Sequence, residues 1–333
     1  MKKRMVAMVL VLMMMLSMIG CSSGGGASEG KEKAEGETYD VAVIVRLTDM
    51  YGAWLKVAYE AAEKDFPNLN ITVMDHQSDN AKLVECMENA VQQQYDFIVV
   101  QTVLGNFEDS FKRAVDAGIP VVSINCYQDW VDQYAAQVYC DEYKLGLAIG
   151  ERASEELPEN AQVVILDGPA GLLLSEQRHD GIVDGLNTRD DITILDNQDA
   201  NFEKDTAMDK TEDWIQAFNG EIDGVLAASD SEALGAVEAF KSSGIDLKDV
   251  HIYGIDGLID ACNAITNGEM SASTLQDATQ YPALSLKLIT DHINGDIDLF
   301  KDLDQTTFDP ELIDSSNVKE QLEFYKEQGL VEE

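Results

Sequence analysis

The sequence predicts an α/β protein with two similar lobes, each built around a parallel β-sheet, and two observations support this prediction. From Tyr39 onward, short apolar β-branched runs alternate with amphipathic stretches, a pattern typical of parallel strands joined by helices. This pattern continues through residues 39–333. A single hydrophobic core usually divides at about that length, so two lobes are the economical arrangement.

Eight main strands can be identified in chain order, in two sets. The first set is predicted at residues 41–45, 71–74, 97–100 and 121–124. Between the first two strands, a helix is predicted from the spacing of Trp54, Val57, Ala58, Ala61 and Ala62. The second set is predicted at residues 163–166, 192–195, 225–228 and 251–255, with a further short strand at 271–275. The spacing of Ala233, Val237 and Phe240 predicts one of the helices in this second set.

The N-terminus has the features of a secretory signal peptide over residues 1–20. Three basic residues precede an uncharged run over residues 5–19, which is shorter than the roughly 20 apolar residues that a membrane-spanning helix needs. Residues 18–21 resemble a bacterial lipobox, which makes Cys21 the expected lipid anchor. Residues 21–38 are rich in Gly, Ser, Glu and Lys and predict a flexible tether. The alternative is an ordinary signal peptide with an incidental cysteine.

These features predict a lipoprotein outside the cytoplasm, anchored to the outer face of the cell membrane, on the periplasmic side if the cell is Gram-negative. The formal net charge is −39, and it becomes −42 without residues 1–20, which carry three basic residues and no acidic ones. Such a surface repels nucleic acid and anionic lipid, so we expect no nucleic-acid partner and a membrane contact through the lipid anchor. We expect the protein to be a monomer.

The remaining cysteines and the histidines do not suggest a metal site. No Cys-x-x-Cys pair is present, and the four histidines lack metal-ligand spacing. We therefore expect no metal and no other cofactor. Whether a disulfide forms is left open for Cys86, Cys126, Cys140 and Cys262.

Polar and aromatic side chains follow several predicted strands at their carboxyl ends, where open parallel sheets bind ligands. These residues are Asp49, Tyr51, Asn125, Phe202, Ser229, Asp230, Asp256 and Gln276. A sugar hydroxyl both donates and accepts hydrogen bonds, so carboxylates beside amides suit it, while aromatic rings suit its C–H faces. Tyr51 and Phe202 could supply such rings from opposite lobes. The alternatives are helix capping for Asp230 and Asp256, and core packing for Tyr51.

Several segments together resemble the periplasmic sugar-binding proteins of the ribose and galactose type, from about Tyr39 to the end of the chain. They are residues 41–51 with Leu55-Lys56, 119–125, 140–146, Arg178 with Gly181, 229–236, 253–256 and 274–278. The resemblance implies two Rossmann-like lobes joined by a three-crossover hinge. Lobe 1 would comprise residues 39–140 and 277–305, and lobe 2 residues 141–276 and 306–333.

The resemblance also implies which residues contact the ligand. They are Asp49, Tyr51, Asn125, Arg178, Phe202, Ser229, Asp256 and Gln276. Only Arg178 is new to the strand-end set, because an Arg on a helix predicted from about Leu173 would otherwise be interpreted as a surface charge. The lobes would close over the ligand by a hinge movement.

Some residues depart from the pattern of the galactose-type relatives. Leu172 and Leu174 stand where those relatives have His and Asp, Ser229 stands where Asn is usual, and Phe202 replaces Trp. Their calcium loop has no counterpart between residues 151 and 162. Galactose itself is therefore disfavoured, while a pentose, a deoxy sugar, a polyol or a modified sugar stays open.

The expected function is that of a solute-binding lipoprotein, which captures a monosaccharide or related polyol and delivers it to the permease subunits of an ABC importer. A receptor that presents its closed form to a signalling partner, or a binder of a non-sugar solute such as a nucleoside, is the alternative. An enzyme is disfavoured because no Gly-x-Gly-x-x-Gly follows a strand and no nucleophile has a placed base. A DNA-binding regulator is disfavoured because a signal peptide stands in place of a helix-turn-helix.

Overall fold

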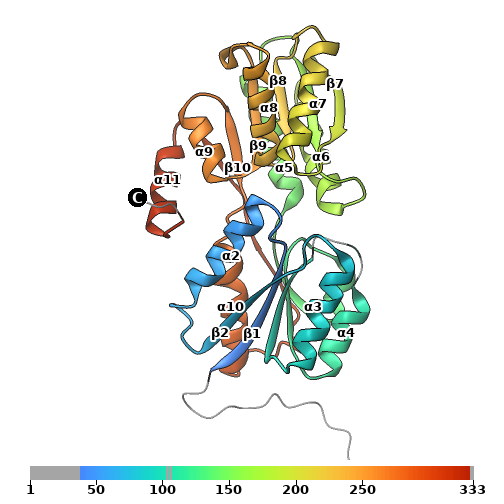
Figure 1. The fold of residues 1–333 in the computed structure, drawn as a ribbon, viewed down its shortest axis with the longest axis vertical. Coiled ribbons are helices and arrows are strands. Elements are labelled where there is room, and N and C mark those ends of the chain that lie inside the picture. The colour runs from blue at the N-terminus through green and yellow to red at the C-terminus, as the bar shows by residue number, and fades with distance from the viewer. Residues whose placement is uncertain (1–37, 103–104, 106, 331–333) are drawn as a thin grey trace, which may run out of the picture. The chain divides into compact units, whose positions relative to one another are not determined.

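The computed structural model describes residues 38–330 except 103, 104 and 106. The predicted signal peptide and the expected lipid anchor Cys21 lie outside the described residues. Within them, the chain forms two six-stranded sheets flanked by helices (Figure 1). The predicted architecture of two parallel-sheet α/β lobes is confirmed.

The first sheet has the strand order β11-β5-β4-β3-β1-β2, and all its strand pairs are parallel. Its strands are β1 (Tyr39–Val45), β2 (Leu69–Asp75), β3 (Phe97–Gln101), β4 (Val121–Asn125), β5 (Ala135–Cys140) and β11 (Gln305–Phe308). One face is covered by α2 (Met50–Ala62) and α10 (Gln280–Ile293), and the other by α3 (Asn80–Gln92) and α4 (Glu108–Asp116). Because both faces are covered, the central strand β1 is apolar and fully buried from Val41 to Val45.

The second sheet has the order β12-β10-β9-β8-β6-β7 and is parallel except for the antiparallel pair of β12 and β10. Its strands are β6 (Gln162–Asp167), β7 (Thr193–Asp199), β8 (Gly224–Ala227), β9 (His251–Asp256), β10 (Ala272–Leu275) and β12 (Glu311–Asp314). Helices α5 (Glu142–Glu156) and α6 (Leu173–Leu186) pack on one face. The other face carries α7 (Lys204–Ala217), α8 (Asp230–Ser242), α9 (Ile259–Thr266) and α11 (Val318–Glu327).

The chain passes between the two sheets three times: after β5, after β10, and between β11 and β12. The third passage lies later than expected, because the boundary drawn after residue 305 falls inside β11, and all four residues of β11 pair with β5. Each passage begins at the end of a strand.

Strands β5, β11 and β12 are missing from the sequence prediction. Gln137 and Tyr139 interrupt the apolar pattern of β5, and β11 and β12 are short strands at the sheet edges, where a continuous apolar run is not required. The helix prediction over α2 is correct, but Val57 does not belong to its buried face, because 38% of this residue is exposed.

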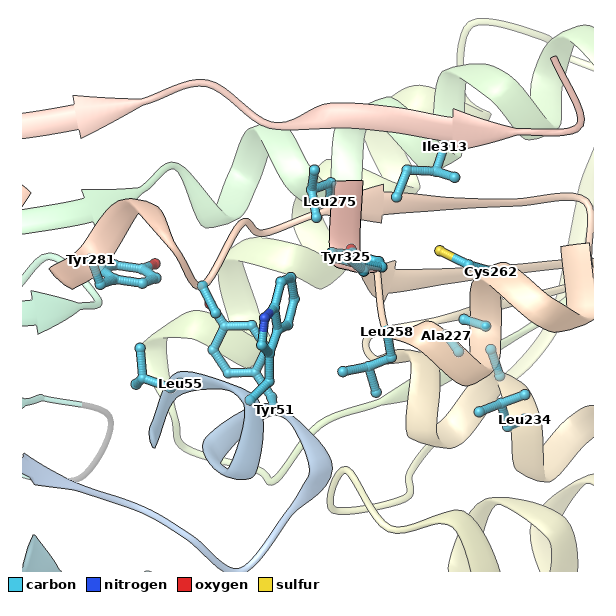
Figure 2. Packing of buried hydrophobic residues seen from close by; sticks show 14 of the residues in the cluster. Tyr51, Leu55, Ala227, Leu234, Leu258, Cys262, Leu275, Tyr281, Ile313 and Tyr325 are labelled. Carbon is cyan, nitrogen blue, oxygen red and sulfur yellow. The ribbon is translucent and has the colours of Figure 1, made fainter. Parts of the chain in front are cut away.

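One apolar cluster continues from the first lobe into the second (Figure 2). Tyr51 and Leu55 of α2 belong to it together with Leu258 and with Tyr325 of α11. Trp54 of α2 meets Tyr325 edge to face, with ring centroids 5.3 Å apart. Any change in the relative position of the lobes must therefore alter the surroundings of Trp54.

Candidate ligand-binding site

A cavity lies at the carboxyl ends of the strands and is lined by residues from both lobes. The lining residues are Arg46, Asp49, Tyr51, Asn125, Leu174, Arg178, Phe202, Ser229, Ser231, Asp256 and Gln276. Eight of the nine residues predicted to bind ligand are among them, and Asp230 is the exception. Most of the residues selected for their position at the strand ends therefore lie together around one cavity.

The backbone is strained at two strand ends that reach the cavity and in the turn after β7. Asn125 ends β4 with a φ of 82°, Asp256 ends β9 with a φ of 122°, and Phe202 has a φ of 59°. Such conformations cost on the order of 1–3 kcal/mol each for residues other than Gly and cluster at functional sites. The surrounding packing holds these three side chains at the cavity in spite of that cost.

Arg178 of α6 is the centre of the hydrogen-bond network in the cavity. Its Nε donates to Glu142 over 2.7 Å, and its Nη1 donates to the Ala228 carbonyl over 2.7 Å and to Asp256 over 3.3 Å. Its Nη2 donates to Oε1 of Gln276 over 3.3 Å. Only 3% of the residue is exposed, so a surface charge is the wrong interpretation of this arginine.

The charged groups around Arg178 shift one another's pKa values. Burial lowers the pKa of Arg178, but the Glu142 and Asp256 carboxylates outweigh burial, so the net shift is upward and the guanidinium stays charged. Burial raises the pKa of Asp256 to about 7; the Arg178 guanidinium opposes this rise, and the Asp49 and Glu142 carboxylates add to it. Asp256 can therefore exist in both protonation states near neutral pH.

Close packing of two glycine-bearing helices sets the position of Arg178. A Cβ on Gly146 of α5 would lie 2.1 Å from the carbonyl oxygen of Arg178, and one on Gly181 would lie 2.2 Å from the carbonyl oxygen of Tyr143. Only glycine lets the two backbones approach this closely. The resulting contact places Arg178 beside Glu142, which is the first residue of α5.

Asp230 does not line the cavity, and its carboxylate is hydrogen-bonded within the second lobe instead. It accepts hydrogen bonds from the Leu258 backbone N–H and the Ser273 hydroxyl, each over 2.7 Å, and is fully buried. It does not cap α8, because Ser229 is the N-cap residue of that helix. Burial raises the pKa of Asp230 well above its usual range, and the nearby Asp256 carboxylate adds to this rise.

Two residues that line the cavity, Asp49 and Tyr51, also have structural roles. Asp49 is the N-cap residue of α2 and accepts from the Gly52 N–H over 2.7 Å, whereas Asp256 caps no helix. Tyr51 is both packed and lining: its hydroxyl donates to the Gln276 carbonyl over 3.1 Å, and its ring meets Trp54 edge to face.

The ring of Phe202 lies close to one arginine from each lobe. The guanidinium carbons of Arg46 and Arg178 are 5.9 Å and 5.8 Å from the centre of its ring. Its backbone N–H donates over 2.8 Å to Glu232, whose pKa burial raises well above the usual range. At this distance the ring face attracts both guanidinium groups electrostatically.

Sequence reasoning missed three residues of the site. Arg46 follows β1 directly, so the strand-end rule could have identified it. Ser231 lies in the first turn of α8, directly after Ser229 and Asp230 in the sequence. Glu142 does not line the cavity, but its Oε1 accepts a hydrogen bond from the lining residue Gln276 over 2.9 Å. In the sequence it looks like an ordinary acidic residue in the first turn of a helix.

Other site types have little support in the part of the chain that the structure describes. Over residues 38–330 with the stated gaps, no group of three or more His, Cys, Asp or Glu residues could hold a metal ion. The four cysteines outside the N-terminal region are free thiols. Among the described helices, none combines the length and apolar character of a membrane span.

Comparison with known proteins places this architecture in one family. The family model described as "Periplasmic binding protein domain" matches residues 41–297. The xylitol-binding protein of Mycolicibacterium smegmatis is 29% identical to this chain, over 79% of this chain and 73% of that protein. The ribose import binding protein of Bacillus subtilis is 26% identical, over 68% of this chain and 72% of that protein. An ABC transporter solute binding protein of Bacillus halodurans, solved with bound myo-inositol, has a TM-score of 0.79 and 27% identity, over 88% of this chain and 100% of that chain. The chain therefore belongs to the periplasmic binding protein family.

Proposed function

We propose that this protein captures a monosaccharide or a related polyol between its two lobes and delivers it to the permease of an ABC importer. The observation that carries the proposal is a cavity whose polar lining comes from both lobes and mixes donors with acceptors. Arg178 and Gln276 can donate, while Asp49 and Asp256 can accept. Hydroxyl groups need both kinds of partner, and the relatives named above are described as binders of xylitol, ribose and myo-inositol.

The two lobes close when the ligand binds, and the protein is attached to the membrane. Lobe 1 comprises residues 39–140 with the segment through β11, and lobe 2 comprises residues 141–276 with the C-terminal segment. A ligand that contacts both lobes binds the closed form more tightly and so shifts the equilibrium towards closure. The monomer is held at the outer face of the membrane by lipid on Cys21, and binding involves no catalysis.

A thermal-shift screen of the chain from residue 28 tests this function. The panel contains pentoses, hexoses, polyols, nucleosides and amino acids, because a ligand at a hundred times its Kd adds about 2.7 kcal/mol to the stability of the native state. We expect one class of sugar or polyol to raise the unfolding midpoint. Asp256→Ala and Arg178→Lys should abolish the shift, and Arg113→Lys, at a half-exposed position outside the cavity, should retain it. If only nucleosides or amino acids raise the unfolding midpoint, the sugar assignment is contradicted. The protein would then be a receptor for a different solute.

A further inference from the structure

The carboxylate of Glu142 is buried next to the cavity but does not line it. Glu142 is the first residue of α5 and follows the end of β5 at Cys140 by two positions, so it lies at the first passage between the lobes. Only 3% of the residue is exposed, and it is not among the lining residues. It does not cap its own helix, because Asp141 is the N-cap residue and accepts from the Lys144 N–H over 3.1 Å. Neither ligand contact nor helix capping therefore explains this buried charge.

Hydrogen-bond donors from both lobes converge on this carboxylate. Its Oε2 accepts from Nε of Arg178 over 2.7 Å. Its Oε1 accepts from Nε2 of Gln276 over 2.9 Å, from Nδ2 of Asn125 over 3.4 Å and from the Cys126 thiol over 3.7 Å. Arg178 belongs to α6 in the second lobe, and Gln276 to the second passage, whereas Asn125 ends β4 in the first lobe. One buried group thus connects the two lobes at two of the passages between them.

The direction of the hydrogen bonds from the second lobe is fixed by Arg178. A guanidinium can only donate, so Gln276 must turn its amide oxygen towards Nη2 of Arg178, which lies 3.3 Å away. The amide nitrogen of Gln276 then faces Glu142 and needs an acceptor there. The second lobe therefore sends donors only to Glu142.

The direction of the hydrogen bonds from the first lobe is fixed by a backbone group. The N–H of Arg46 can only donate, and it donates to Oε1 of Gln101 over 2.8 Å. Nε2 of Gln101 then donates to Oδ1 of Asn125 over 2.6 Å, which leaves Nδ2 of Asn125 facing Glu142. The two chains of hydrogen bonds therefore end at the same acceptor. An ionised carboxylate fits this place because both of its oxygens only accept.

The charge of Glu142 acts on two of its neighbours. In the described part of the chain it is the closer of the two carboxylates paired with Arg178, at 2.7 Å against 3.3 Å for Asp256. Burial raises the pKa of the Cys126 thiol well above its usual range, and the Glu142 carboxylate adds to this rise. The Arg178 and Arg46 guanidiniums oppose the rise. The reactivity of the Cys126 thiol therefore reports on the charge of Glu142 without any ligand.

We propose that Glu142 is a positioning residue for ligand capture, which holds Arg178, Gln276 and Asn125 at the cavity by accepting hydrogen bonds from both lobes. The inference rests on the proposed function and adds to it a residue that the ligand does not touch. A glutamine at this position accepts at one end only, so its amide nitrogen would face a donor whichever way the amide is turned. Neither chain of hydrogen bonds can reverse, because one begins at a guanidinium and the other at a backbone N–H.

Calorimetric titration of the chain from residue 28 with xylitol, myo-inositol and D-ribose tests this role. We expect Glu142→Gln to weaken binding of the recognised probe roughly 10- to 100-fold, the size of a lost hydrogen bond to a charged group. Glu142→Asp keeps the charge but is one methylene shorter and cannot reach the donors of both lobes, so it should bind at least about fivefold more weakly than the wild type. An acidic residue that only supplied charge to the first turn of α5 would be replaced by Asp without loss. Glu155→Gln, at an exposed position of the same helix, is the control and should bind as the wild type does.

Alkylation of Cys126 by iodoacetamide at pH 8 is a second measurement, made without ligand. Peptide mass spectrometry separates Cys126 from the other three thiols of the chain from residue 28. We expect its alkylation in Glu142→Gln to be at least about threefold faster than in the wild type, because loss of the carboxylate lowers the pKa of the thiol and the thiolate is the reactive form. Glu155→Gln should react at the wild-type rate.

The outcomes separate this inference from the function on which it rests. Wild-type binding of a probe, together with an affinity of Glu142→Gln within twofold of the wild type, would overturn the positioning role and leave the proposed function intact. A wild-type chain that binds none of the three probes would count against the sugar assignment, and an unchanged alkylation rate in Glu142→Gln would then overturn the role of Glu142 separately. Circular dichroism of the ligand-free variants shows whether each is folded. If Glu142→Gln does not fold, the affinity of Glu142→Asp decides, and wild-type affinity in that variant would overturn the inference.

Discussion

Asp256 is the residue whose ionisation most directly links the cavity to the stability of the fold. It is buried, pairs with Arg178 and has a pKa of about 7, against an ordinary value of 3.8. Between these two pH values the unfolded chain has released the proton while the folded chain still holds it. The folded state thus binds more protons, and its stability falls as the pH rises from about 4 to about 7.

Replacing Asp256 with Asn should reduce this fall. We expect the free energy of unfolding of the wild type to decrease between pH 5 and pH 7, and the decrease in Asp256→Asn to be smaller by on the order of 2 kcal/mol. Asp230 and Glu232, whose pKa values burial also raises, account for part of the remaining slope. Urea denaturation at pH 5, 6 and 7 measures the difference, with Asp260→Asn at an exposed position as the control. Equal slopes in the wild type and Asp256→Asn would contradict this prediction.

At the scale of elements, the contact of α5 with α6 decides where the central arginine lies. Gly146 and Gly150 of α5 face Gly181 and Gly185 of α6, and a Cβ on any of the four would come within 2.5 Å of a backbone atom of the other helix. A larger side chain must push the helices apart, which costs typically 1–3 kcal/mol in a well-packed interior. The same displacement would move Arg178 away from Glu142 and from the cavity.

Gly146→Ala should therefore lower both stability and affinity. We expect the free energy of unfolding to fall by about 2 kcal/mol and the affinity for the recognised ligand to fall at least tenfold, although Gly146 does not line the cavity. Chemical denaturation and calorimetric titration measure the two effects. Glu155→Ala, at an exposed position of the same helix, is the matched control and should change neither quantity appreciably. A loss of stability at unchanged affinity would show that this helix contact does not set the geometry of the site.

At the scale of the whole molecule, the two lobes share buried contacts in addition to the chain crossovers. Tyr51 lines the cavity and meets Trp54, with ring centroids 5.8 Å apart, and Trp54 in turn meets Tyr325 of α11. The Tyr325 hydroxyl donates over 2.5 Å to the carbonyl of Gly257, which follows Asp256 directly. These aromatic contacts connect the cavity with the helix that packs on the second lobe.

Trp54 should therefore report ligand binding through its fluorescence. The chain has three tryptophans, and Trp130 and Trp214 do not line the cavity. We expect the recognised ligand to change the tryptophan emission in the wild type, in Trp130→Phe and in Trp214→Phe, but not in Trp54→Phe. Fluorescence titration of the four proteins makes this comparison, with calorimetry to confirm that Trp54→Phe still binds. A ligand-dependent signal that persists in Trp54→Phe would rule out lobe movement at this contact as its source.

The sequence by itself determined the fold class, most strands and most of the cavity lining. Central strands such as β1 and β3 are buried on both faces, so their apolar β-branched runs are visible without any knowledge of their partners. Residues at the carboxyl ends of such strands, including Asn125 and Asp256, then collect at the strand-end edge of each parallel sheet. These features depend on local pattern and on the common direction of the strands.

Only the tertiary structure decided the features that depend on partners distant in the chain. Strands β5, β11 and β12 form through long-range pairing rather than through a local apolar run, and the same pairing sets the third passage between the sheets. Asp230 points to Leu258 and Ser273, while its neighbour Ser229 lines the cavity, and no sequence pattern separates the two. The burial of Arg178 needs the close approach of α5 and α6, which brings Glu142 to it across 36 residues. The cost of burying these charges is offset only by partners that the fold brings together.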